Sequence, residues 1–344
     1  MGTNKLKGGI KLKKKLLLIA TVILSLLALV ACGDKTEKTN NEGKEEVKEI
    51  NVGYFPNLSH APAMIGIEKG IFEKNLEGVK VTPSTFPDGS VFMDSLLTGK
   101  IDIGYVGPGP VLNRYLQGGE VVLISNATIG ENVLVVRKDL EIKTGKDLEG
   151  KTVATASTGC THDILLRKML KEEGSAVEEN GGKVKRMAQK PAATMGLLEQ
   201  KQIDATVVSE PWASQMEAEG VGKVVRDYNE LPWNGELPAT VLVVSKDFLE
   251  KNPDLVDKFI KAHEESIDFI NNNKKESVDL VAKNIEDATE QSIDKKIIES
   301  SFKRVEFTSK INKDVLQEFA DLLKELDFIK EDSNLENLFW SKLK

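Results

Sequence analysis

The stretch LLTGKIDIGYV, residues 96–106, has a counterpart further along the chain in LLEQKQIDATVV, residues 197–208. Each copy has the pattern of the end of an amphipathic helix, a short polar turn and a buried strand. Repetition of such a unit predicts two similar α/β lobes, with strands and helices in alternation. Two similar lobes would leave a cleft between them.

A second pair of similar segments supports the duplication. VLVVRKDL, residues 133–140, resembles VLVVSKDF, residues 241–248, and both are apolar, strand-like runs that end in charge. Chance similarity of short Val-rich strands would explain either pair alone. Both pairs occur in the same order, which favours duplication and predicts that the chain leaves lobe one near Arg137 and returns near Val243. Two such crossings would form a hinge.

The N-terminus has the pattern of a secretory signal. Lysines between Lys5 and Lys15 precede the apolar run 16–30, and small residues lead to Cys32. This run is shorter than the roughly 20 residues of a permanent membrane-spanning helix, which predicts cleavage. Leu-Val-Ala-Cys at 29–32 resembles a bacterial lipobox, so Cys32 is predicted to be lipidated; an ordinary signal with an incidental cysteine is the alternative. The polar residues 33–48 predict a flexible tether.

Charge and cysteine content limit the class of protein. The chain has a formal net charge of −7, and the part after the lysine-rich leader is more acidic. This balance argues against nucleic acid as a partner. Cys160 is the only cysteine after Cys32. We therefore expect no intramolecular disulfide and a fold stabilised by its buried core.

The rest of the chain predicts strands and helices in alternation, which is typical of mostly parallel sheets. The predicted strands are 50–55, 79–86, 101–106, 121–127, 133–137, 152–156, 184–188 and 205–209. After Val244 the pattern is helical and charged, and we expect helices at 248–271, 276–285, 294–304 and 314–326 that pack on lobe one.

Four loops follow predicted strands, where ligands of open α/β sheets bind. Asn57-Leu58-Ser59-His60-Ala61 offers hydroxyl and amide groups, or only helix caps. Gly107-Pro108-Gly109-Pro110 lets the backbone approach a ligand, or only starts a helix. The loop 157–163, Ser-Thr-Gly-Cys-Thr-His-Asp, combines hydroxyls with exposed amides and predicts an anion cradle, with capping by Thr161 as the alternative.

The fourth loop is Glu210-Pro211-Trp212. Trp212 could wall a cleft and Glu210 could accept a hydrogen bond from a ligand amine. The alternative is a hinge salt bridge for Glu210 and a core position for Trp212. The sequence favours neither role for Glu210.

Catalysis is not indicated by the sequence. Cys160 lies two residues from His162, but a nucleophile and its base normally come from separate loops, so a cysteine hydrolase is disfavoured. The three histidines, His60, His162 and His263, lack metal-ligand spacing, and there is no phosphate or dinucleotide glycine motif. We expect no metal and no cofactor.

The residues taken together resemble the solute-binding proteins of ABC importers for nitrate, sulfonates and taurine. The resemblance covers about residues 49–270 and is carried by GYFPNLSHA at 53–61, EKGIF at 68–72, GKIDIG at 99–104, DLEGK at 147–151, GCTHD at 159–163, and IDA at 203–205 with EPW at 210–212. It implies a two-lobed periplasmic-binding-protein fold of type II that closes on a solute. It also implies delivery to a membrane permease driven by a separate ATPase, and a monomer.

The resemblance implies that Asn57, Ser59, His60, Thr161 and His162 line the cleft, with amides near Gly159 facing oxyanion oxygens. The family more often has Ser or Thr where this chain has Cys160, which removes a hydroxyl donor. Glu210 would serve the amine of a zwitterion such as taurine. Relatives bind pyrimidine vitamin precursors, for which Trp212 and Tyr54 could stack.

The leading hypothesis is a lipid-tethered, extracytoplasmic receptor for a small organic anion, with a sulfonate as the first candidate. A receptor for a pyrimidine-type vitamin precursor is second, and a hydrolase or sensor domain on the same fold is third. The predicted boundaries are 1–32 for the signal peptide, 33–48 for the tether, 49–136 with 244–344 for lobe one, and 137–243 for lobe two. The predicted ligand-binding residues are Asn57, Ser59, His60, Gly107, Pro108, Thr128, Gly159, Cys160, Thr161, His162, Glu210 and Trp212.

Overall fold

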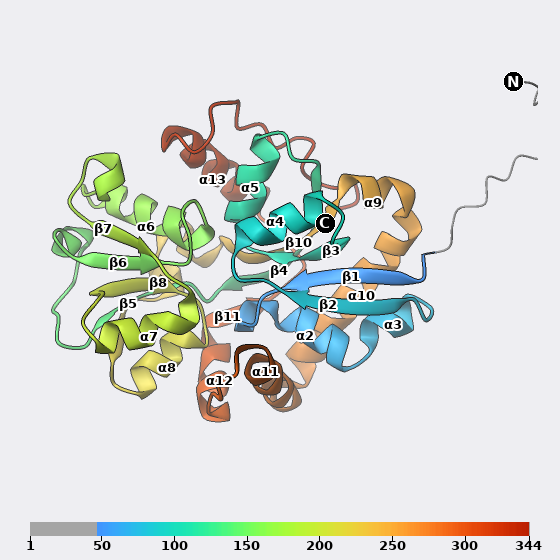
Figure 1. Cartoon of the computed structure of the whole chain (residues 1–344), viewed down its shortest axis with the longest axis horizontal. Helices are drawn as coiled ribbons and strands as arrows, with labels where there is room; N and C mark the ends of the chain where they lie inside the picture. Colours follow the sequence, from blue (N-terminus) through green and yellow to red (C-terminus); the bar gives the residue numbers. More distant parts are fainter. Residues whose placement is uncertain (1–46, 344) are drawn as a thin grey trace, which may run out of the picture. The chain divides into compact units, whose positions relative to one another are not determined.

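Two β-sheets, each flanked by helices, organise the chain in the computed structural model, which describes residues 47–343 (Figure 1). The predicted signal peptide, the lipidation of Cys32 and nearly all of the predicted tether lie outside the described residues. Within the described part, every helix is too short or too polar to span a bilayer.

The first sheet has six strands in the order β11-β4-β10-β3-β1-β2. Its strands are β1 (Glu49–Tyr54), β2 (Lys80–Thr85), β3 (Ile103–Val106), β4 (Val121–Gly130), β10 (Pro238–Ser245) and β11 (Val305–Phe307). The second sheet has five strands in the order β7-β6-β8-β5-β9. These strands are β5 (Val133–Arg137), β6 (Thr152–Thr155), β7 (Lys185–Ala188), β8 (Ala205–Val208) and β9 (Gly222–Arg226).

The two sheets have the same strand order. Read in sequence, β2-β1-β3-β10-β4 of the first sheet matches β7-β6-β8-β5-β9 of the second, so that β3 is equivalent to β8 and β10 to β5. The segments 96–106 and 197–208 contain the equivalent strands β3 and β8, and 133–140 and 241–248 contain β5 and β10. β10 pairs antiparallel with β3, as β5 does with β8. The predicted duplication is therefore confirmed at the level of sheet topology.

The aspartates of the repeated motif have the same structural role in both sheets. Asp102 Oδ2 accepts the Asn51 backbone N–H at 2.8 Å, and Asp204 Oδ2 accepts the Thr152 backbone N–H at 2.9 Å. Each carboxylate thus binds the N–H of a residue in the neighbouring parallel strand. The motif is explained by strand pairing, without any contact to a ligand.

Both sheets are mixed, so the prediction of mostly parallel sheets is wrong. Each sheet contains two parallel pairings, and the others are antiparallel. Two of the antiparallel strands, β5 and β10, enter their sheets directly from a crossing, and the third, β11, is the edge strand supplied by the C-terminal region. Counting alternating strands and helices cannot reveal this reversal of direction.

The chain crosses between the sheets earlier than predicted. β4 belongs to the first sheet and β5 to the second, so the first crossing is at Glu131 and Asn132, not near Arg137. The return runs through residues 227–237, before β10, and not near Val243. The predicted lobe boundaries therefore move: β5 joins lobe two, and β10 joins lobe one. Lobe one comprises residues 47–130 with 238–343, and lobe two comprises residues 133–226.

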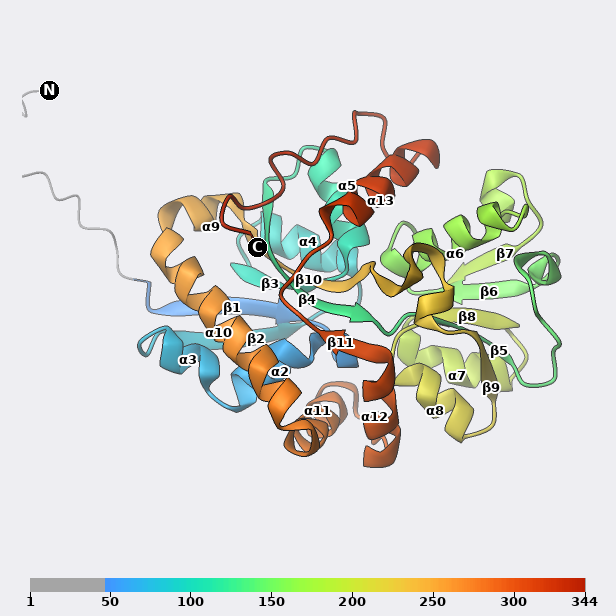
Figure 2. The same ribbon diagram turned by 180° about the vertical axis from the view of Figure 1, so that it is seen from behind.

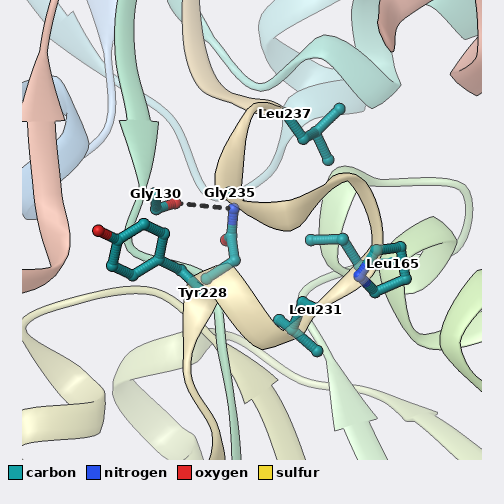
Figure 3. A pocket seen from close by; sticks show the side chains of 8 residues that line it. Gly130, Leu165, Tyr228, Leu231, Gly235 and Leu237 are labelled. Carbon is teal, nitrogen blue, oxygen red and sulfur yellow. Dashed lines mark hydrogen bonds between the residues drawn. The ribbon is translucent and has the colours of Figure 1, made fainter.

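The two crossing segments lie side by side and are closely packed. Figure 3 shows Gly130, at the end of β4, next to Tyr228 and Gly235 of the second crossing, and Leu165, Leu231 and Leu237 on the other side of a small pocket. The space between these residues is only about 10 Å³, near the lower limit for one water molecule. Gly130 has φ +87°, and a Cβ there would lie 2.5 Å from the Arg304 carbonyl oxygen. The hinge region therefore offers no room for a solute.

Helices cover both sheets. In lobe one they are α2 (Ala61–Glu68), α3 (Ile71–Asn75), α4 (Gly89–Leu97), α5 (Pro108–Leu116), α9 (Lys246–Lys251), α10 (Pro253–Asn272), α11 (Lys274–Thr289), α12 (Lys295–Ser301) and α13 (Lys313–Glu325). In lobe two they are α6 (Thr161–Glu172), α7 (Pro191–Glu199) and α8 (Trp212–Ala218). Sequence reasoning missed α3, α8, β9 and β11, which are short.

The C-terminal helices pack largely on lobe one, as expected. Helix α10 contacts α2 and α3, where Phe259 stacks on Phe72 with ring centroids 4.6 Å apart, and α11 contacts α2 (Figure 2). Two of these helices also reach lobe two, since α12 contacts α8 and α13 contacts α6. The C-terminal region therefore bridges the lobes at places away from the two crossings.

Candidate functional site

A cavity of about 440 Å³ lies between the lobes, at the carboxyl ends of the parallel strands. It is lined by the loops that follow β1, β2 and β3 in lobe one and β6, β7 and β8 in lobe two, together with Glu131 of the first crossing and residues near the end of α11. A volume of this size is typical of a site for a small organic molecule.

Most of the predicted ligand-binding residues meet at this cavity. Those that line it are Asn57, Ser59, His60, Gly107, Cys160, Thr161, His162 and Trp212. They come from both lobes, although they are far apart in sequence. Their contact with a solute stays a prediction.

Four of the predicted residues do not line the cavity: Pro108, Thr128, Gly159 and Glu210. Pro108 is the first residue of α5 and is buried. Thr128 is fully buried in β4, and its hydroxyl donates to the Ser59 carbonyl oxygen at 2.6 Å. Thr128 therefore positions the loop of Ser59 from behind.

The prediction that the Gly159 amide binds an anion of the solute is wrong. The Gly159 N–H donates to Asp163 Oδ2 at 2.7 Å, so it is already used. Asp163 is fully buried, and its other oxygen accepts from Arg167 at 2.9 Å. The first amides of α6 have no acceptor within the helix and remain suited to an anion.

Glu210 forms the buried salt bridge that was the alternative prediction. Its side chain is 0% exposed, and Oε1 lies 2.9 Å from Arg304 Nη1 in lobe one. Both oxygens also accept hydrogen bonds at 3.0 Å, from the Ser214 hydroxyl and N–H and from the Ser301 hydroxyl. The assignment of Glu210 to a ligand amine is therefore wrong, because arginine and serines occupy both oxygens.

Arg304 connects the lobes through more than Glu210. Its guanidinium also lies 2.9 Å from Glu217 and 3.2 Å from Asp227, and its carbonyl oxygen accepts the Glu131 N–H at 2.7 Å. Arg304 of lobe one thus binds two carboxylates of lobe two, one carboxylate of the second crossing and the backbone of the first crossing.

The glycines at 107 and 109 allow the lobes to touch. A Cβ at Gly107 would lie 2.6 Å from Thr161 Oγ1, and a Cβ at Gly109 would lie 2.6 Å from the Thr161 nitrogen. The Gly109 N–H donates to Thr161 Oγ1 at 3.3 Å across the lobes. The close approach predicted for this loop is therefore an approach to the other lobe.

His60 presents an uncharged ring to the cavity. It is buried, its Nε2 lies 3.3 Å from Thr240 Oγ1, and its Nδ1 has no hydrogen-bond partner among the described residues. Burial lowers the pKa of His60 to about 3, so the ring is neutral at physiological pH. Through its free Nδ1, a neutral His60 ring can either donate a hydrogen bond to a solute or accept one from it.

His162 faces the cavity from α6. Its Nδ1 lies 4.0 Å from Cys160 Sγ, and its Nε2 is buried without a partner in the described region. Burial lowers the pKa of His162 to about 4 and raises the pKa of the Cys160 thiol. Cys160 is therefore a protonated thiol, which is the wrong state for a nucleophile.

Sequence reasoning missed Glu131, which lies in the first crossing. This residue is 2% exposed and lines the cavity, and its Oε2 has no hydrogen-bond partner within residues 47–343. Burial raises the pKa of Glu131 to about 8, while hydrogen bonding by Ser59 works in the other direction. One signal for this residue was present in the sequence, because Glu131 is a single carboxylate between two apolar, strand-like runs.

Aromatic side chains form part of the wall. Phe55, Phe86 and Trp212 line the cavity, and the rings of Phe55 and His60 are 5.2 Å apart. Tyr54 does not contribute, because its hydroxyl donates to Asn284 Oδ1 at 3.1 Å in the core. The predicted stacking by Tyr54 is therefore wrong. Among residues 47–343 no group of three or more His, Cys, Asp or Glu side chains is arranged to hold a metal ion.

Comparison with known proteins gives relatives along most of the chain. The NMT1-like family matches residues 43–286. The taurine-binding periplasmic protein of Escherichia coli (strain K12) is 29% identical over 219 residues, which cover 63% of this chain and 65% of that protein.

Solved structures share the fold. The alkanesulfonate-binding protein SsuA from Xanthomonas axonopodis pv. citri, bound to MOPS, has a TM-score of 0.72 at 17% identity and covers 86% of this chain and 99% of its own. The nitrate-binding protein NrtA from Synechocystis PCC 6803 has a TM-score of 0.68 at 18% identity, with 83% of each chain covered. The two-lobed periplasmic-binding-protein fold is thus confirmed, and the chain belongs to the NMT1-like family.

Proposed function

We propose that the chain is an extracytoplasmic solute-binding protein of an ABC importer that captures a small organic anion, such as an aliphatic sulfonate, taurine or a nitrate-like ion, by closure of its lobes. The observation that carries the proposal is the interlobe cavity with buried polar atoms of His60, His162 and Glu131 that lack protein partners among the described residues. Buried polar atoms without partners are rare in folded proteins, and a ligand is one way to satisfy them. The names of the relatives agree with this function.

The anionic end of the solute would bind at α6. The helix N-terminus carries a partial positive charge, and Thr161 and the neutral ring of His162 stand beside it. Neutral donors in a buried site bind an oxyanion without placing a second full charge in the interior.

The remaining parts of the proposal concern partners. The protein would be a non-catalytic monomer, tethered to the membrane by a lipid on Cys32, that delivers its solute to a membrane permease. The proposed function involves no nucleic acid, metal ion or cofactor. The buried, protonated thiol of Cys160 favours binding over hydrolysis.

A pyrimidine-type vitamin precursor is the second candidate solute. It is favoured by the aromatic wall of Phe55, Phe86 and Trp212, against which a planar ring could stack.

A thermal-shift panel tests the function. Taurine, ethanesulfonate, nitrate and 4-aminopyrimidine would be added to the purified protein, and a solute at a hundredfold excess over its Kd should stabilise the fold by about 2.7 kcal/mol. Stabilisation by a sulfonate supports the leading candidate, and stabilisation by 4-aminopyrimidine alone supports the second. No shift with any of the four would contradict the proposed solute classes.

A further inference from the structure

Glu131 is a buried acid that the fold holds in place without a partner, among the described residues, for one of its oxygens. Its N–H donates to the Arg304 carbonyl oxygen at 2.7 Å, and the next residue, Asn132, donates to the Gly130 carbonyl oxygen at 2.8 Å. Glu131 also has φ +58°, a conformation that non-glycine residues rarely adopt. The carboxyl group is therefore fixed at the cavity wall by the crossing itself.

The other ionisable side chains of the cavity do not compensate a charge on Glu131. Asp88 accepts from the Ser90 and Val91 N–H groups as the cap of α4. His60 and His162 are neutral because burial lowers the pKa of each. Of the described residues that line the cavity, Lys190 is the only cation, and it is exposed to solvent.

The charged groups behind Glu131 are already paired. Glu210 is the acid whose charge acts on Glu131, and it is bound to Arg304. Arg304 contacts Glu131 through its carbonyl oxygen, while its guanidinium serves the three carboxylates of Glu210, Glu217 and Asp227. A buried carboxylate without a cation is strongly disfavoured, so a positive group in the cavity would gain from meeting it.

We propose that Glu131 accepts a hydrogen bond from a protonated amine or another N–H donor of the solute, and so determines specificity. This rests on the proposed function and narrows it: the solute carries a basic or N–H-bearing group in addition to any anionic group. A zwitterionic sulfonate would place its anion at Thr161 and His162 in lobe two and its ammonium at Glu131 in the crossing. An amine-bearing heterocycle would present its N–H to the same carboxylate.

The opposite use of Glu131 makes a different prediction. A protonated carboxyl could donate to a solute oxygen, and then a plain anion would bind as well as a zwitterion. Glutamine at this position would keep such a donor. The two uses are therefore separable by one substitution and one pair of solutes.

The test is isothermal titration calorimetry with two matched pairs of probes, taurine with ethanesulfonate and 4-aminopyrimidine with pyrimidine. We expect the amine-bearing member of one pair to bind the wild type at least tenfold more tightly than its amine-free partner. In Glu131→Gln this ratio should fall below about threefold. Glu77→Gln is the matched control, since Glu77 also has positive φ (57°) but lies on the surface, and it should keep the wild-type ratio.

Equal or tighter binding of the amine-free probe would overturn the role of Glu131, as would an unchanged ratio in Glu131→Gln, and both results leave the receptor function standing. Failure of all four probes to bind the wild type would instead reject the sulfonate and pyrimidine classes of solute, and the inference with them. Urea unfolding of Glu131→Gln checks its fold. If that variant does not fold, the wild-type ratio decides alone.

Discussion

Replacing Arg304 with methionine should destabilise the chain by about 3–5 kcal/mol, because the substitution leaves a buried carboxylate without its cation. Glu210 is 0% exposed, and its remaining donors would be the hydroxyl and N–H of Ser214 and the hydroxyl of Ser301. Glu217 and Asp227 are more than a third exposed, so their loss of Arg304 should add little, about 0–1 kcal/mol each. Methionine retains most of the apolar stem of the arginine and isolates the effect of charge.

The assay is urea unfolding at pH 7 without solute, with the free energy of unfolding taken from the linear extrapolation. Glu210→Gln in the Arg304→Met background should recover part of the loss, because a neutral amide is easier to bury than a carboxylate. Lys303→Met, an exposed neighbour, should change stability by no more than about 0.5 kcal/mol. A loss below about 1 kcal/mol for Arg304→Met, or no recovery in the double variant, would refute this reasoning.

Three further predictions concern closure, the cleft and pH. Gly109→Ala should reduce solute affinity at least tenfold in calorimetry, because the added Cβ would lie 2.6 Å from the Thr161 backbone nitrogen. Gly196→Ala is the control, since there is open space around Gly196, and it should keep the wild-type affinity. Equal affinities of Gly109→Ala and the wild type would argue against contact of the lobes in the bound state. Thr161→Ala should lower stability by about 1 kcal/mol but affinity by more than tenfold. Thr161 is the first residue of α6 and not its cap, so parallel losses of melting temperature and affinity would reduce it to a contact between the lobes. His263 is fully buried and its pKa is lowered to about 4, so the unfolded chain binds more protons between pH 4 and 6.5 and stability is lost as pH falls through that window. His60 and His162 contribute in the same direction, and His263→Gln should therefore reduce the loss of unfolding free energy between pH 7 and pH 5 by about 2 kcal/mol without abolishing it. An unchanged pH dependence in the variant would contradict this prediction.

The repeated segments were enough to predict the duplicated fold. A buried strand after a polar turn is a local pattern, and the two copies keep it with an aspartate in the same place. Asp102 and Asp204 each bind the N–H of a neighbouring parallel strand, so the motif persists for a reason of strand pairing. Direction and sheet membership of β5 and β10 are not local properties, which is why the crossings were misplaced.

The candidate site was only partly predictable, for a related reason. The loops after β1 and β6 carry polar side chains next to helix starts, and such loops are recognisable from sequence. Whether Glu210 meets a solute or a cation depends on Arg304, which is distant in sequence. Glu131 became a candidate only once the crossing was located, because its burial depends on the packing of both lobes.

The central claim is that a small solute binds between the two lobes, and native mass spectrometry of the wild type and Ala239→Phe tests it most directly. Ala239 lines the cavity and is 7% exposed, so phenylalanine there would fill part of the space, whereas Ala218→Phe at the exposed end of α8 provides a control. The account predicts one solute molecule on the wild type and on the control, taken up from purification or from added taurine, and none on a folded Ala239→Phe. Equal solute occupancy in all three proteins would contradict it.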